Sequence, residues 1–333
     1  MTKLSIGYAA MLERFAPREA VELAEHAERS GFVGAMASDH FQPWTPTQGQ
    51  SSFVWNVLTA IAERTTGDVG TGATAPTFRM HPAVVAQASA TLAAMYPGRH
   101  WLGLAAGDAL NEHVVGQYWP EAPERINRLF EAIEIIQKLF TGSRAGRDVK
   151  YSGQFFKLES SRLWTMPDEA PPIIVATAGP VTAKRAGKHV DGIMTVGAPI
   201  DRVAALFARF DEGLRESGRQ SSATSKVLQL HLSWAPTDEE ALANAMREWP
   251  VGAMRFGRSD IRSPFEFEQL ARLVRPEDFE GRVIVSSDPD VHRAAIQRYA
   301  DLGADRIYLH NAGRDQRAFL DVFARDVLPK VRR

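Results

Sequence analysis

Short apolar segments alternate along the chain with longer segments in which apolar positions recur at helical spacing. Residues 33–37 are apolar and small throughout, and such a run indicates a strand that is buried on both faces, as in a parallel sheet. Patterns of this kind predict strands at residues 4–8, 33–37, 69–73, 101–105, 173–176, 192–195, 227–235 and 306–310.

Segments with helical periodicity fill the intervals between these strands. Pro17 suits the first turn of the first helix, and residues 237–240 have the spacing of a capping box. The predicted helices span residues 17–30, 54–64, 82–95, 123–140, 181–188, 201–217, 289–302 and 315–331, with a further helix that begins near Thr237.

Eight strands, each followed by a helix, predict the α/β fold known as a (β/α)8 or TIM barrel. A hairpin-like stretch at 150–158 and an irregular stretch after Trp249 interrupt the alternation. We therefore expect one domain over residues 1–333, with insertions at about 145–165 and 249–281, after the fourth and seventh strands. An open, doubly wound sheet is the alternative, but no G-x-G-x-x-G motif opens a helix after the first strand.

Composition narrows the class of protein. With 44% hydrophobic residues, a chain of 333 residues can bury a large core. The formal net charge of -1 argues against nucleic acid as a partner, because proteins that bind it carry a basic excess. No apolar run approaches a membrane span, the first residues lack the apolar core of a signal peptide, and cysteine is absent. We expect a cytoplasmic enzyme that acts on a small molecule, with no membrane partner.

Polar residues that follow the strands of such a barrel meet at one rim, where TIM-barrel enzymes carry their active sites. The strand at 33–37 leads directly into Asp39, His40 and Trp44. His40 could transfer a proton, since imidazole titrates near neutrality, but a structural hydrogen bond at the barrel mouth explains it equally well. Asp39 could orient His40, contact a cofactor or cap a turn, and Trp44 could stack on a ligand or anchor its loop.

Acidic and basic residues follow several other strands. Glu13 follows the first strand, while Asp108 and Glu112 follow the fourth, where they could also serve as acids favoured at a helix start. Nothing has the ligand spacing of a metal motif, so we expect no metal. From the last third of the chain, the side chains that could reach the same rim are His231, Arg258, Arg282 and His310.

Three segments on this rim are small and rich in glycine: residues 70–76, 106–107 and 177–180. Glycine lets the backbone approach a flat ligand closely and leaves N–H groups exposed. Because residues 177–180 open a helix, they are also a candidate cradle for an anion or phosphate.

Several motifs carry a resemblance to a known family. They are S-D-H-F-Q-P-W at 38–44, P-T-F-R at 76–79, A-L-N-E at 109–112 and S-D-P-D at 287–290. With these motifs the chain resembles the bacterial luciferase-like (β/α)8 superfamily, and more narrowly its deazaflavin branch of F420-dependent glucose-6-phosphate dehydrogenases. The likeness extends from about residue 6 to 325. It implies hydride transfer with F420 on an alcohol or carbonyl substrate, and a homodimer.

The resemblance also implies roles for individual residues. His40 would transfer the proton, with Trp44 and Glu13 flanking the site of hydride transfer, and a non-proline cis peptide would fall at Gly72-Ala73. The family threonine that contacts the cofactor is replaced by Ala75. The implied cofactor-binding residues are Asp39, Gly72, Ala73, Ala106, Gly107, Asn111, Ala178, Gly179, Val181 and Thr182.

Two departures concern the chemistry and the substrate. Asp108 stands where the family has a catalytic glutamate, one methylene longer, and a shift of roughly 1 Å at a catalytic group can cost about a hundredfold in rate. The first phosphate-binding lysine of the family falls at 198–199, where no cation stands, while Arg258 and Arg282 match the other two cations. With Thr195, these arginines are the expected substrate-binding residues, for a sugar phosphate or equally for another alcohol, a ketone or an activated double bond.

Two other functions are compatible with the same fold. One is an FMN-dependent luciferase-like monooxygenase or reductase. The other is a non-catalytic homologue that binds a ligand or serves as a scaffold, an alternative motivated by Asp108 and by the missing lysine.

Overall fold

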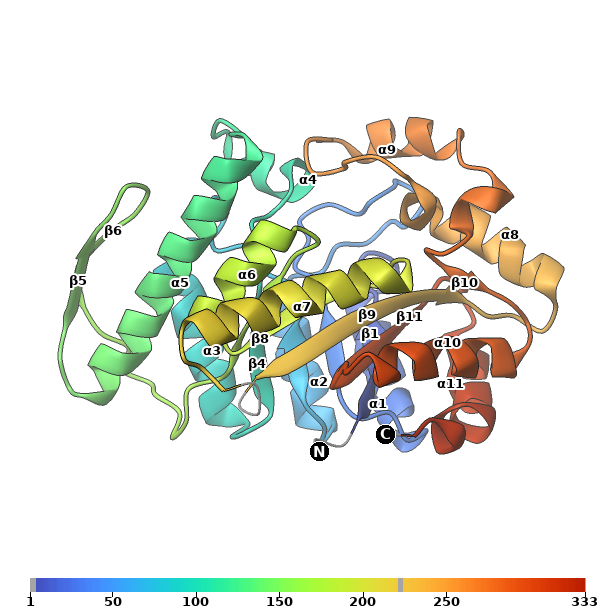
Figure 1. Cartoon of the computed structure of the whole chain (residues 1–333), viewed down its shortest axis with the longest axis horizontal. Helices are drawn as coiled ribbons and strands as arrows, with labels where there is room; N and C mark the ends of the chain where they lie inside the picture. Colours follow the sequence, from blue (N-terminus) through green and yellow to red (C-terminus); the bar gives the residue numbers. More distant parts are fainter. Residues whose placement is uncertain (1–3, 221–223, 333) are drawn as a thin grey trace.

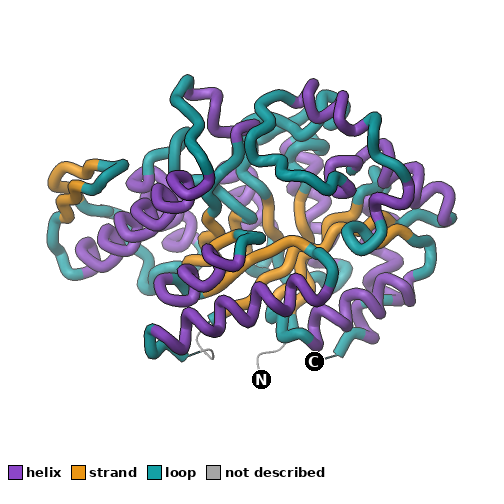
Figure 2. The backbone as a smooth tube through the Cα atoms, turned by 45° about the horizontal axis from the view of Figure 1, so that its top comes forward, coloured by secondary structure: helices purple, strands orange, loops and turns teal. Residues whose placement is uncertain are grey.

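Eight parallel strands form a closed barrel in the computed structural model, which describes residues 4–220 and 224–332. The sheet closes because β9 pairs with both β8 and β11, and the strands follow one another around it in chain order. In Figure 2 the strands lie at the centre and the helices surround them. The predicted TIM barrel is thereby confirmed. Its strands are β1 (Ser5–Ala10), β2 (Ala35–Ala37), β3 (Val69–Thr71), β4 (His100–Leu104), β7 (Ile173–Ala176), β8 (Gly192–Val196), β9 (Ser225–Ser233) and β11 (Arg306–Asn311).

Helices stand at all nine predicted positions. Thr237 caps one of them by accepting a hydrogen bond from Glu240 N at 3.2 Å, as the capping-box spacing indicates. These helices are α1 (Pro17–Arg29), α2 (Val54–Arg64), α3 (Pro82–Met95), α5 (Ala122–Arg144), α6 (Pro180–His189), α7 (Ile200–Glu216), α8 (Asp238–Glu248), α10 (Pro289–Asp301) and α11 (Gln316–Asp326).

Backbone chemistry explains where element ends differ from the prediction. Gly34 has φ +88°, which a strand does not accommodate, so β2 begins at Ala35 rather than at residue 33. The last helix ends at Asp326 instead of residue 331, because Pro329 has no N–H and its ring clashes with a helical backbone. A 3-10 turn over Leu328–Lys330 replaces the predicted last turn.

The barrel interior is filled at the end away from the site. Trp101 and Tyr308 lie there, with a hydrogen bond of 3.0 Å from Trp101 Nε1 to Tyr308 Oη. A Cβ on Gly70 would lie only 1.9 Å from Trp101 Cε2, so the glycine makes room for the indole. This layer closes the barrel below and leaves the carboxyl ends of the strands to form a cavity. Its buried members are Ala9, Met36, Trp101, Ile174, Met194, Val227 and Tyr308.

Two segments extend beyond the barrel repeat. The hairpin of β5 (Val149–Ser152) and β6 (Lys157–Ser161) lies to one side of the molecule (Figure 1). Residues 249–281 contain α9 (Pro264–Ala271), which Figure 1 places near the short helix α4 (Ala109–Glu112). Phe267 of α9 packs in one buried cluster with Leu110 of α4.

The remaining elements are short. They are β10 (Ile284–Val285) and the 3-10 helices His113–Val115, Pro250–Ala253 and Pro276–Phe279. None of the helices in the described part of the chain has the length and apolarity that crossing a membrane requires.

Candidate active site

A cavity of about 560 Å³ opens at the carboxyl ends of the barrel strands. Its wall combines residues that follow most of the strands with residues of α5 and of the segment 249–281. The sequence-predicted residues on this wall are Glu13, Asp39, His40, Trp44, Gly72, Ala73, Ala106, Gly107, Asp108, Asn111, Ala178, Gly179, Thr182, Thr195 and Arg258.

Two predicted residues are not part of the wall. The side chain of Val181 is 74% exposed on the first turn of α6. Arg282 is half-buried and donates to Met254 O at 3.4 Å. Arg258 therefore lines the cavity, whereas Arg282 does not line it but lies near enough to Arg258 for its charge to help lower the pKa of that guanidinium.

Glu13 and His40 form a close, buried pair on the cavity wall. His40 Nδ1 lies 2.7 Å from Glu13 Oε1. Burial by itself would lower the pKa of His40, but the charge of Glu13, its contact with the ring and the nearby Asp108 together raise that pKa. Burial likewise opposes the charge on Glu13, yet His40 outweighs it and lowers the pKa of the carboxyl. The pair therefore favours an imidazolium beside a carboxylate.

Trp44 connects His40 to the segment 249–281. Its ring meets the His40 ring edge-on at a centroid distance of 5.1 Å and packs against Phe267 at 5.2 Å. The guanidinium carbon of Arg258 lies 5.5 Å from the Trp44 ring centre. Gln48 Oε1 accepts a hydrogen bond from Trp44 N at 2.8 Å, which fixes the loop that carries the indole.

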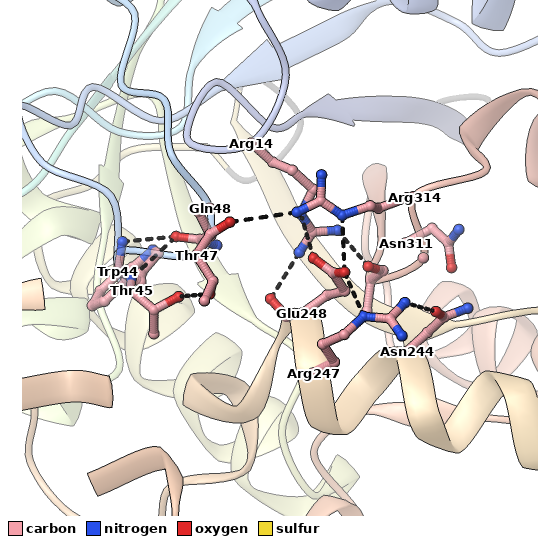
Figure 3. Close-up of polar contacts among 12 residues, drawn as sticks. Arg14, Trp44, Thr45, Thr47, Gln48, Asn244, Arg247, Glu248, Asn311 and Arg314 are labelled. Atoms are coloured by element: carbon pink, nitrogen blue, oxygen red, sulfur yellow. Dashed lines mark hydrogen bonds and ion pairs between the residues drawn. The ribbon is translucent and has the colours of Figure 1, made fainter. Parts of the chain in front are cut away.

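An ionic network centres on the buried side chains of Arg14, the residue after Glu13, and Glu248, and extends to the exposed Arg247 and Arg314 (Figure 3). Arg14 donates to Glu248 O at 2.7 Å, and its Nε lies 3.5 Å from Glu248 Oε2. Glu248 Oε1 also accepts from Arg247 and Arg314, at 2.8 and 2.9 Å. Burial lowers the pKa of Arg14 to about 10 even with Glu248 beside it. The network holds the backbone next to Glu13 against α8 and the loop after β11.

Asp39 is held by two neighbours. Arg79 Nη2 lies 2.9 Å from Asp39 Oδ1, and the hydroxyl of Thr74 donates to Asp39 Oδ2. Arg79 N also donates to Glu112 Oε2 at 2.8 Å. Burial raises the pKa of Glu112 to about 7, although Arg79 opposes the shift. Glu112 lies on the cavity wall, and the sequence alone does not distinguish it from an acidic residue that is favoured near a helix start.

Asp108 begins α4 as its N-cap. Its Oδ1 accepts hydrogen bonds from Asn111 N at 3.2 Å and from Asn111 Nδ2 at 3.1 Å. Asn111 Oδ1 in turn accepts from the backbone of Phe41 at 2.7 Å and of Gln42 at 3.1 Å. The carboxylate that replaces the expected glutamate thus helps to fix the loop between His40 and Trp44.

Small residues form the wall along β3, β4 and β7. The peptide bond between Gly72 and Ala73 is cis, as the family resemblance implies. Gly107 has φ +84°, and a Cβ there would meet Glu112 Cγ at 2.8 Å, so this position requires glycine. Gly179 is the N-cap of α6, which has no side-chain cap, so the backbone N–H groups that follow Pro180 in its first turn are available to an anion. The wall suits a flat ring with an anionic extension.

The part of the wall along β9 and β11 holds two histidines that contact each other. His231 Nδ1 and His310 Nδ1 lie 3.1 Å apart, and Trp249 packs against both rings. The sequence indicates that each histidine can reach the rim, but not that they meet.

Comparison with other proteins finds relatives of this chain. The family model of luciferase-like monooxygenases matches residues 2–306. Two relatives named F420-dependent glucose-6-phosphate dehydrogenase, from Mycobacterium avium and Tsukamurella paurometabola, are 38% and 39% identical to this chain. Each alignment covers 100% of this chain and 99% of the relative.

Solved structures share the fold over nearly the whole chain. An F420-dependent secondary alcohol dehydrogenase in complex with an F420-acetone adduct superposes with a TM-score of 0.93 at 31% identity, covering 99% of this chain and 100% of that one. An F420-dependent tetrahydromethanopterin reductase from Methanopyrus kandleri, at 20% identity, superposes with a TM-score of 0.78 over 99% of this chain and 100% of that one.

Proposed function

Because the chain belongs to the luciferase-like monooxygenase family, we propose that it is an F420-dependent oxidoreductase that interconverts an alcohol and a carbonyl compound. The observation that carries the proposal is the position of the Glu13–His40 pair on the same cavity wall as the glycine-rich segments. The relatives at 38% and 39% identity bear the same cofactor and reaction class in their names.

The cavity fits a deazaflavin. Gly72, Ala73, Ala106 and Gly107 offer backbone without bulky side chains to a flat ring, and the uncapped start of α6 offers N–H groups to its phosphate. Asp39, Asn111, Ala178, Gly179 and Thr182 complete the proposed set of cofactor-binding residues on the wall. Val181, whose side chain is off the wall, would contribute only its backbone N–H in the first turn of α6. When bound, F420 supplies a hydride acceptor in its oxidised form and a hydride donor in its reduced form.

His40 is the proposed proton-transfer residue. Glu13 occupies its Nδ1 side, so Nε2 is the atom that exchanges a proton with the substrate oxygen. In alcohol oxidation the neutral imidazole accepts the hydroxyl proton, and in carbonyl reduction the imidazolium returns it. The charge of Glu13 strengthens His40 as a base, because it stabilises the imidazolium that forms.

Three further residues are assigned to the reacting end of the cavity. Trp44 covers His40 and excludes water from the site of hydride transfer. Asp108 adds negative charge near His40, and the carboxylate oxygen that does not cap α4 is available toward a ligand. Thr195 contributes a hydroxyl to the wall for substrate binding.

The substrate need not carry a phosphate. Arg258 is a cation on the wall, whereas Arg282 lies away from it and the position after β8 has Ala198 instead of a lysine. One arginine can bind an anion, but it provides fewer charge-assisted contacts than three cations would. We therefore propose a site that accepts neutral hydroxyl or carbonyl substrates as well.

We also propose that the chain is one domain with two insertions and that it acts in the cytoplasm as a homodimer. The family resemblance supports the dimer, and the cysteine-free composition is compatible with a reducing compartment. Light scattering coupled to size-exclusion chromatography would give one species of twice the chain mass. A monomer at all concentrations would refute the dimer.

Cofactor binding tests the proposal directly. Purified protein should bind oxidised F420, measured by fluorescence titration, and should reduce it when alcohols are added. FMN is the matched competitor, because it shares the ribityl phosphate but differs in the ring. Tight binding of FMN without binding of F420 would favour the flavin-dependent alternative and refute the proposal.

A further inference from the structure

Strand register brings His231 and His310 together on the cavity wall. β9 and β11 pair in parallel, with His231 opposite His310. Val227 and Tyr308 belong to the cluster that fills the barrel. His231 lies four residues after Val227 and His310 two residues after Tyr308, so both histidines lie on the same inward face of their strands. Both rings are largely buried, at 8% and 5% exposure, and both line the cavity.

The contact between the two rings fixes where their protons lie. The Nδ1 atoms are 3.1 Å apart and the ring planes are perpendicular, so one Nδ1 carries hydrogen and donates to the other, bare Nδ1. Burial lowers the pKa of His231 to about 3, aided by Arg258, and burial with the neighbouring charges holds the pKa of His310 well below its ordinary value. Both rings are therefore neutral at physiological pH.

Two neutral rings joined in this way are complementary at their other nitrogens. The ring that donates through Nδ1 has a bare Nε2, which accepts a hydrogen bond. The ring that accepts through Nδ1 carries hydrogen on Nε2, which donates one. In the described part of the chain neither Nε2 has a hydrogen-bond partner, and neither belongs to the set of fully buried, unpartnered polar atoms. Both atoms are thus open to the cavity.

We propose that His231 and His310 form a substrate subsite that hydrogen-bonds hydroxyl groups other than the one oxidised at His40. A hydroxyl can donate or accept, so one hydroxyl can donate to the bare Nε2 and a neighbouring hydroxyl can accept from the Nε2–H. Gln229, also on the wall and without a side-chain partner among the described residues, offers a further donor and acceptor. This inference rests on the proposed function. It narrows the substrates to neutral polyols or to phosphorylated sugars whose hydroxyl groups bind at this subsite.

The position of the pair relative to His40 supports a substrate that spans both. Trp44 contacts the His40 ring and lies 6.3 Å from Trp249, centroid to centroid. Trp249 lies 5.0 Å from His231 and 4.5 Å from His310. The two indoles form an apolar strip between the reacting imidazole and the neutral pair, which suits the carbon chain of a polyol.

NMR of the protein labelled with ¹⁵N-histidine tests the subsite without any turnover. We expect one ring of the pair with hydrogen on Nδ1 and the other with hydrogen on Nε2, and neither should titrate between about pH 6 and 8. Adding glucose should shift both Nε2 signals, whereas 2-propanol should not. Signals that titrate near neutrality, or that glucose leaves unchanged, would overturn the proposal.

Variants give an independent measurement. His231→Leu should raise KM for glucose or glucose 6-phosphate by about three- to tenfold, the loss of one neutral hydrogen bond, and leave KM for 2-propanol unchanged. His231→Gln keeps a polar atom near Nε2 and should retain most of the affinity. An equal effect of both variants on all alcohols would refute the subsite. Failure to bind F420 in the wild type would refute the proposed function instead, while the NMR result would still decide the subsite.

Discussion

Replacing Asp108 separates the two roles that its carboxylate can have. Oδ1 caps α4 through Asn111 N and also accepts from the Asn111 side chain. In Asp108→Ala, losing the N-cap costs about 1 kcal/mol. Losing the partly exposed bond to the amide costs about 1 kcal/mol more. The free energy of unfolding should therefore fall by about 2 kcal/mol.

Asp108→Asn is the matched control, because it keeps an oxygen at the same place and removes only the charge. Asparagine caps helices as well as aspartate, so stability should stay within about 0.5 kcal/mol of the wild type. His40 loses one of the carboxylates that raise its pKa, so alcohol oxidation should begin to rise at lower pH. The kcat of Asp108→Asn at its optimal pH should fall by less than the roughly hundredfold that loss of a general acid or base costs.

Urea unfolding followed by circular dichroism measures the stability, and steady-state reduction of F420 measures kcat. A third variant, Asp108→Glu, keeps the charge but caps poorly and should cost about 1 kcal/mol. The reasoning would be refuted if Asp108→Asn were as unstable as Asp108→Ala. It would equally be refuted if Asp108→Asn lost as much kcat as His40→Ala, because the carboxylate would then take part in the chemistry.

Three further predictions concern the reacting end of the cavity. His40→Ala should lower kcat by about 10²–10⁴-fold and leave the Kd of F420 unchanged in a fluorescence titration; activity near that of the wild type would rule out proton transfer by His40. Glu13→Gln removes the charge that raises the pKa of His40, so the rise of alcohol oxidation with pH should move to lower pH, and an unmoved profile would contradict the pairing. Arg258→Gln should raise KM for a phosphorylated substrate more than for its neutral analogue, measured by steady-state kinetics, because Arg258 lines the cavity. Arg282→Gln should change neither KM, because Arg282 does not line the cavity. A larger effect of Arg282→Gln than of Arg258→Gln would contradict this assignment.

Local patterns were sufficient to predict most of the fold. The apolar run at residues 33–37 and its seven counterparts predict the barrel because a parallel strand covered on both faces has a sequence that stands out. The ends of elements depend on single residues. The positive φ of Gly34 cannot be read from an apolar pattern, and Pro329 ends the last helix although the predicted helical segment continues past it. Short helices such as α4 and α9 lack the length that makes periodicity informative.

The candidate site could be predicted as a set of residues but not as a set of partners. Residues after parallel strands share a rim, so His40, Trp44 and Arg258 were predicted to lie there. The capping role of Asp108 and the contact between the two histidines depend on strand register and on loop conformation. Arg282 was predicted to lie on the wall from its likeness to a family position, but its guanidinium donates to Met254 O instead. A likeness in sequence does not fix the direction in which a loop carries a side chain.

Transfer of deuterium from an alcohol to F420 in a single turnover tests the central claim most directly. Secondary alcohols and glucose 6-phosphate deuterated at the carbinol carbon would be mixed with protein and oxidised F420. The account predicts reduced F420 that carries the deuterium, with a slower rate than for the unlabelled alcohol, and a transfer slowed by about 10²–10⁴-fold in His40→Ala. If F420 stayed oxidised with every alcohol while bound FMN was reduced, the account would be contradicted.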